Sequence, residues 1–145
     1  MIIRDRDGLD SACTILVVDD AQDVLEVMTE IVVHLGYRAV PLSSGMAAID
    51  YLAAGSRADA AIVDLCLPVM DGIQIIRALR GLKPGLAALL VSGRLGADER
   101  AFAGDVVLLQ KPFRISEMDA ALGRALEISG ILNAPSEKAG RAAAG

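Results

Sequence analysis

The feature that most constrains the fold of this chain is a regular alternation of two hydrophobic patterns. Five short, mostly apolar runs have the length of buried β-strands, and between them apolar residues recur at the spacing of a helix face. The five runs are 14–18, 38–42, 60–63, 87–91 and 106–109. Strands that alternate with helices in this way predict an α/β fold of the doubly wound class, a parallel sheet with helices on both faces.

The predicted helices are defined by their apolar positions and by their start and stop residues. The apolar positions of the first three are Leu25, Met28, Val32 and Leu35, then Ile49 and Leu52, then Ile73, Ile76 and Leu79. Gly36 and Gly55 are expected to end the first two helices, and Ser43 or Ser44 to cap the second. Residues 97–103 leave room only for a short fourth helix. The fifth is expected to open with a capping box from Ser116 to Asp119 and to continue through Leu122 and Leu126.

Composition favours one folded domain. Hydrophobic residues make up 54% of the 145 residues and charged residues 23%, which is enough apolar material for a core. We expect a flexible leader at 1–12, one domain at 13–130 and a flexible tail at 131–145. The residues after 130 are too few for an output module such as a DNA-reading helix-turn-helix. The chain is therefore expected to be a single-domain protein or the first domain of a longer one.

Charge and hydropathy restrict the cellular locations and the binding partners that are expected for this chain. No apolar run approaches the roughly 20 residues that span a bilayer, and the amino terminus does not resemble a signal peptide, so a cytoplasmic protein without a membrane contact is expected. The formal net charge of −5 repels a phosphate backbone, so no direct nucleic-acid contact is expected. Cys13 and Cys66 lack metal-ligand spacing and are predicted to be reduced, half-buried thiols.

Polar residues that suit phosphoryl chemistry follow the predicted strands. Asp19 and Asp20 follow the first strand, Asp64 the third, Ser92 the fourth and Lys111 the fifth. Each alone has an ordinary explanation as a turn, cap or surface residue. In a doubly wound sheet, however, the carboxyl ends of the strands line one edge, where ligands bind. Three carboxylates meeting there would raise each other's pKa unless a cation sits among them, and Mg²⁺ prefers such oxygen ligands. One carboxylate could then attack phosphorus, with the lysine and hydroxyl balancing the charge.

Four motifs in this order resemble the receiver domains of bacterial two-component response regulators, over about residues 13–128. The motifs are Val17 to Asp20, Asp64 to Gly72, Val91 to Gly93 and Lys111 to Phe113. The resemblance implies a flavodoxin-like sheet of five parallel strands in the order 2-1-3-4-5. It also implies a phosphoprotein of phosphorelay signal transduction. Such a domain accepts a phosphoryl group from a sensor histidine kinase or a histidine phosphotransfer protein and signals to a downstream protein target. It is a signalling domain that catalyses only its own phosphorylation and dephosphorylation.

The resemblance also implies a metal site and an acceptor. Asp64 matches the phosphoacceptor. Asp20 matches a direct Mg²⁺ ligand, and Asp19 an acid that acts mainly through metal-bound water. The backbone carbonyl of Cys66 would complete the metal ligands from the protein.

The remaining matched residues are expected to bind the phosphoryl group and shape the site. Lys111 matches the lysine that pairs with the phosphoryl oxygens, and Ser92 the hydroxyl that moves to bind them. The bond between Lys111 and Pro112 is a candidate cis peptide. Gly72 would allow the close turn that starts the third helix.

The sequence departs from the family pattern at three places. Leu108 stands where the family usually has an aromatic residue that swings inward on activation. Ser92 and Lys111 are 19 positions apart, a short spacing that falls on the fourth helix. Cys66 and Arg94 occupy positions that modulate dephosphorylation in the family. A modulating role for these two residues and mere tolerance of them at these positions are equally good explanations. We therefore expect activation to move mainly the loop after Ser92 and the short fourth helix, and the last strand little.

Three other functions are compatible with parts of the sequence. His34 could belong to a kinase or phosphotransfer module, but its place at a predicted helix end is more simply explained by the helix dipole. A phosphatase of the haloacid-dehalogenase type would need a second Asp two residues after Asp64, where this chain has Cys66. A receiver-like interaction module that works without phosphorylation is the alternative that remains.

Overall fold

The computed structural model describes residues 13–94, 96 and 104–131. Within them, five parallel strands form one sheet in the order β2-β1-β3-β4-β5, and four helices accompany them. The strands are β1 Thr14–Val18, β2 Arg38–Leu42, β3 Ala60–Asp64, β4 Ala87–Ser92 and β5 Val107–Gln110, and the helices are α1 Gln22–His34, α2 Gly45–Ala53, α3 Gly72–Leu82 and α5 Ile115–Ile128. The predicted doubly wound α/β fold and its strand order are confirmed. The predicted leader at 1–12, the fourth helix at 97–103 and residues 132–145 of the predicted tail at 131–145 lie outside the described residues. Ile131, the first residue of that predicted tail, packs against the core instead, and its N–H donates to the Leu126 carbonyl at 2.9 Å.

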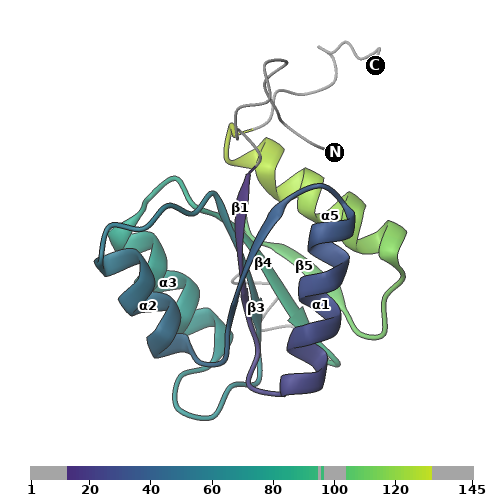
Figure 1. Cartoon of the computed structure of the whole chain (residues 1–145), viewed down its shortest axis with the longest axis horizontal. Coiled ribbons are helices and arrows are strands. Elements are labelled where there is room, and N and C mark those ends of the chain that lie inside the picture. Colours follow the sequence, from purple (N-terminus) through teal and green to yellow (C-terminus); the bar gives the residue numbers. More distant parts are fainter. Residues whose placement is uncertain (1–12, 95, 97–103, 132–145) are drawn as a thin grey trace.

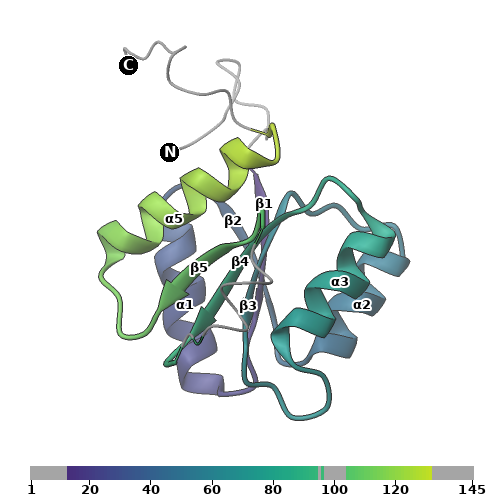
Figure 2. The same cartoon turned by 180° about the vertical axis from the view of Figure 1, so that it is seen from behind.

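The sheet separates two layers of helices. Helices α1 and α5 cover one face and α2 and α3 the other, as Figures 1 and 2 show from opposite sides. Alternate residues of each strand enter the two cores: Ile15 and Val17 pack on the side of α1 and α5, and Leu16 and Val18 on the side of α2 and α3. The central strands β1, β3 and β4 are buried along their whole length, whereas the edge strands β2 and β5 are only partly buried. No helix of the described part is long and apolar enough to cross a membrane.

The strand ends extend slightly beyond the predicted apolar runs. The first two strands match the prediction, while β3 includes Asp64, β4 includes Ser92, and β5 is Val107–Gln110 where 106–109 was predicted. The reason is that the parallel ladder continues past the apolar residues, pairing Asp64 with Val91 and Ser92 with Gln110. Two polar residues of the carboxyl edge are thereby part of the sheet and held by its hydrogen bonds.

The helix boundaries follow the predicted signals with one exception. Ser44 caps α2, where its hydroxyl oxygen accepts the Ala47 N–H at 3.0 Å. The capping box predicted from Ser116 to Asp119 is wrong, because α5 begins at Ile115, with Arg114 as its N-cap. The Glu117 carboxylate accepts the Arg114 N–H at 2.6 Å. Glu117, the third residue after the N-cap, therefore sets the start of the helix, and the N-cap lies two residues before the predicted Ser116.

The two cysteines differ from the predicted half-buried pair. Cys13 is buried at the start of the sheet, and Cys66 is exposed in the loop after β3. Burial, helped by the nearby Asp59 charge, raises the pKa of the Cys13 thiol to about 11. Cys13 is therefore a protonated core thiol at neutral pH, and Cys66 is a free surface thiol beside the carboxyl edge.

Candidate functional site

The three acidic residues meet at the carboxyl edge of the sheet. Because β1 and β3 are neighbours in register, with Val18 beside Val63, the chain brings Asp19 and Asp20 next to Asp64. Carboxylate oxygens of the three aspartates lie within 4.8 Å of one another. Asp19 and Asp64 are buried and Asp20 is exposed. The three carboxylates therefore meet at one edge, as the sequence predicted, and the structure adds that two of them are buried and the third is exposed.

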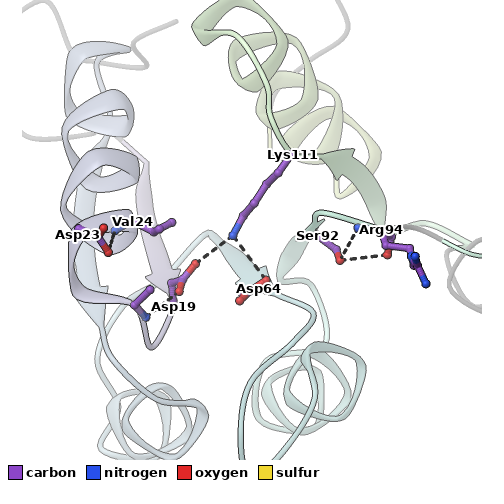
Figure 3. Close-up of polar contacts among 8 residues, drawn as sticks. Asp19, Asp23, Val24, Asp64, Ser92, Arg94 and Lys111 are labelled. Carbon is purple, nitrogen blue, oxygen red and sulfur yellow. Dashed lines mark hydrogen bonds and ion pairs between the residues drawn. The ribbon is translucent and has the colours of Figure 1, made fainter.

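Lys111 supplies the positive charge among these acids. Its ammonium group lies 3.5 Å from Asp19 Oδ2 and 3.8 Å from Asp64 Oδ1 (Figure 3). The Lys111 N–H donates to the Ser92 carbonyl at 2.8 Å, which fixes the lysine backbone at the end of β5. The bond from Lys111 to Pro112 is cis, as the resemblance implied. One ammonium group thus bridges two buried carboxylates, with Asp19 the nearer.

The electrostatics of Asp64 show that this one cation does not balance the site. Burial raises the pKa of the Asp64 carboxyl above its ordinary value of 3.8, and the charges of Asp19 and Asp20 raise it further. Lys111 and a hydrogen bond from the Cys66 N–H act in the opposite direction but do not cancel the rise. A second cation among the oxygens would favour the ionised carboxylate. The donor set of close carboxylate oxygens therefore fits Mg²⁺.

Asp19 also organises the backbone. Its Oδ1 accepts the Ala21 N–H at 2.9 Å, at the point where α1 begins. Its other oxygen faces Lys111. One buried carboxylate therefore links the start of α1 to the lysine from the far edge of the sheet.

Ser92 lies at the same edge, but its hydroxyl is turned away from the acids. The Ser92 hydroxyl donates to the Arg94 carbonyl at 3.0 Å and accepts the Arg94 N–H at 3.1 Å. Figure 3 shows these bonds apart from the contact of Lys111 with Asp64, and the Arg94 side chain points away from Asp64. The sequence predicted the strand-end position of Ser92 and did not predict this orientation.

The start of α3 packs tightly against the end of β3. A Cβ on Gly72 would lie 2.6 Å from the Asp64 carbonyl oxygen and 2.9 Å from Leu65 Cα, so only glycine fits without a shift. Asp71 caps the helix, accepting the Gln74 N–H at 2.9 Å while Gln74 accepts the Asp71 N–H at 3.0 Å. Sequence reasoning missed this capping box, although the spacing Asp-x-x-Gln before an apolar run signals it.

The two remaining predicted positions, Leu108 and His34, lie outside the acidic cluster. Leu108, in β5, is partly buried and packs into the core on the side of α2 and α3. His34 is the last residue of α1, at the end of that helix away from the acids, as predicted. The described part of the chain thus brings together Asp19, Asp20, Asp64 and Lys111.

Comparison with known proteins identifies the family. Residues 15–123 match the family model described as response regulator receiver domain. Response regulator MprA of Mycobacterium tuberculosis (strain ATCC 25177 / H37Ra) is 36% identical over 111 residues, covering 74% of this chain and 48% of that protein. The probable transcriptional regulatory protein TcrX of Mycobacterium tuberculosis (strain ATCC 25618 / H37Rv) is 30% identical over 132 residues, covering 89% and 55%. The chain belongs to the response regulator receiver domain family, and it spans about half the length of these curated relatives.

Solved structures agree with this fold. A response regulator receiver protein from Sinorhizobium medicae WSM419 superposes with a TM-score of 0.74 at 28% identity, covering 82% of this chain and 98% of that one. Response regulator protein TrrA from Thermotoga maritima, solved in complex with Mg(2+)-BeF, gives 0.70 at 23% identity, covering 79% and 99%. At that lower identity the likeness to TrrA concerns the fold alone.

Proposed function

We propose that this receiver domain accepts a phosphoryl group on Asp64, in the presence of Mg²⁺, from a sensor histidine kinase or a histidine phosphotransfer protein. The observation that carries the proposal is the cluster of Asp19, Asp20 and Asp64 with the Lys111 ammonium among them. Membership of the receiver family supports the same chemistry. The complex of TrrA with Mg(2+)-BeF supports a Mg²⁺ site in a protein of this fold.

The residues of the site have distinct parts in this reaction. Asp19, Asp20 and Asp64 and the backbone carbonyl of Cys66 would hold Mg²⁺, which supplies charge neutralisation when bound. An Asp64 carboxylate oxygen forms the bond to phosphorus as the bond from phosphorus to the donor histidine nitrogen breaks. Lys111 pairs with the phosphoryl oxygens and offsets their charge.

Ser92 provides the conformational response. A phosphoryl group on Asp64 offers the Ser92 hydroxyl a charged acceptor, which is stronger than the neutral carbonyl it now bonds. Binding it requires the hydroxyl to leave the Arg94 backbone, 3.0 Å and 3.1 Å away. The loop after Ser92 therefore changes on phosphorylation, and a downstream protein target reads that change. Cys66 and Arg94 stay predicted modulators of dephosphorylation.

We also propose the limits of the domain, its location in the cell and the molecules that it does not contact. Residues 13–130 form the receiver, with a leader before and a tail after it. The domain is a cytoplasmic signalling module without an enzymatic activity on other molecules, and it contacts neither nucleic acid nor membrane itself. The alternative, an interaction module that works without phosphorylation, is disfavoured because the acids and the lysine are all present.

Intact-mass measurement after incubation with a small phosphodonor tests the proposal. The wild type should gain one phosphoryl group with Mg²⁺ and none with a chelator, and Asp64→Asn should gain none under either condition. Asp50→Asn, at an exposed aspartate of α2, is the matched control and should react as the wild type does. Phosphorylation of Asp64→Asn at the wild-type rate would reject the acceptor. No phosphorylation of the wild type under any donor would favour the alternative.

A further inference from the structure

The last turn of α3 is bonded to the starts of three strands. Arg80 Nε donates to the Leu86 carbonyl at 3.0 Å, just before β4. Arg80 Nη1 lies 2.7 Å from Asp105 Oδ1, two residues before β5. The Lys83 ammonium donates to the Ala58 carbonyl, just before β3. These contacts lie at the amino edge of the sheet, opposite the acidic cluster, and the phosphoryl chemistry does not use them.

Arg80 is suited to hold a fixed geometry. A guanidinium group is a planar fork, so one side chain can bond a carbonyl and a carboxylate in set directions. The side chain of Arg80 is 21% exposed, whereas that of Asp105 is 60% exposed. The arginine is therefore anchored by packing and by Leu86, and it draws the more exposed Asp105 toward α3.

Strand β5 needs such an anchor. It has four residues, lies at the edge of the sheet, and among the described strands pairs only with β4. At its far end the Lys111 N–H bonds the carbonyl of Ser92, the residue expected to respond to phosphorylation. A shift of Ser92 would therefore pull on the end of β5, and the Arg80 contacts oppose that pull at its start.

We propose that Arg80 is a clamp that fixes the start of β5 to α3 and β4, so that phosphorylation rearranges the loop after Ser92 while β5 stays in place. The inference rests on the proposed function for its second half. Its first half, the restraint on the start of β5, concerns the resting protein alone.

Hydrogen exchange of residues 105–110 tests the clamp in the resting protein. Arg80→Met removes both bonds, and Asp105→Asn weakens one of them with little change of shape. Arg80→Met should exchange about five- to tenfold faster than wild type over this segment, because at least one net hydrogen bond of ordinary strength is lost, and Asp105→Asn should show a smaller increase of the same sign. Arg57→Met removes another arginine–aspartate pair at the same edge, 3.4 Å long, and should leave this segment unchanged. Wild-type exchange in both Arg80→Met and Asp105→Asn would overturn the clamp.

The second arm adds Mg²⁺ and beryllofluoride as the phosphoryl mimic. In wild type, exchange should change in the loop that begins at Gly93 and stay constant in β5. In Arg80→Met the change should extend into β5. A wild-type β5 that changes as strongly as the loop would also overturn the clamp. Binding of the mimic is measured independently, as the Mg²⁺-dependent rise in melting temperature that beryllofluoride causes. A wild type that does not bind the mimic therefore counts against the phosphoryl site, while the resting-state comparison still decides the clamp.

Discussion

At the scale of single residues, the Asp64 carboxylate is both buried and close to the like-charged carboxylates of Asp19 and Asp20. Its side chain is 11% exposed, and Lys111, the cation nearest to it, also faces Asp19. Ionised Asp64 is therefore unfavourable in the metal-free fold, which agrees with the raised pKa. Asp64→Asn keeps the shape and removes the charge. We expect it to stabilise the metal-free domain by about 1 kcal/mol, a rise of a few degrees in melting temperature.

The same pKa shift gives this effect a pH dependence. The carboxyl has a higher pKa in the fold than when unfolded, so the fold binds the proton more tightly and stability falls as Asp64 ionises. The penalty is fully present above the raised pKa of the folded state. It disappears as the pH falls toward the ordinary value of 3.8. Thermal melts in a chelator should therefore show the largest gain of Asp64→Asn at neutral pH and a shrinking gain on acidification. A gain that grows on acidification would contradict the raised pKa.

The composition of the acidic cluster could be predicted from the sequence because it depends only on strand ends sharing an edge. Asp19, Asp64 and Lys111 needed no knowledge of side-chain torsions to be assigned to one site. The orientation of the Ser92 hydroxyl could not be predicted in this way, because it depends on local turn geometry. The pairing of Arg80 with Asp105 joins residues 25 positions apart and required the packing of α3 to be known.

At the scale of elements, the strands were predicted closely because each has a short apolar centre. The predicted ends of β3 and β4 are one residue too early, because Asp64 and Ser92 continue the parallel ladder. The start of α5 was missed because two capping signals overlap: Glu117 accepts from Arg114, two residues before the predicted pair of Ser116 and Asp119. The tight start of α3 was expected from Gly72, and the structure adds what it contacts. Local signals thus predict which elements exist, and tertiary contacts set their exact limits.

Gly72 permits a prediction about α3. In Gly72→Ala the new methyl group would meet backbone atoms of Asp64 and Leu65, which cannot move without distorting the end of β3. We expect a loss of about 1–3 kcal/mol in the free energy of unfolding, measured with urea. Gly81→Ala in the same helix is the control, since a Cβ there meets nothing within 4 Å. It should stabilise by about 0.5–1 kcal/mol. Equal effects of the two substitutions would show that the contact at Gly72 carries no cost.

At the scale of the whole molecule, binding of a cation adds to the stability of the entire domain. A ligand that binds only the folded state stabilises it in proportion to its affinity and concentration. Mg²⁺ should therefore raise the melting temperature of the wild type, and Asp20→Ala should lose most of that rise. Glu30→Ala, at an exposed acid of α1 outside the acidic cluster, should keep it. The same Mg²⁺ response in wild type and Asp20→Ala would argue against a metal site at the carboxyl edge.

The measurement that tests the central claim most directly is chemical trapping of the phosphorylated residue. An acyl phosphate on an aspartate is reduced by borohydride to homoserine, which marks the position permanently, whereas a phosphate ester is not. After phosphorylation with a small donor and Mg²⁺, reduction and peptide sequencing by mass spectrometry should find homoserine at position 64 alone. Homoserine at position 19 or 20, or a phosphoryl group that resists reduction and lies on a serine, would contradict the account.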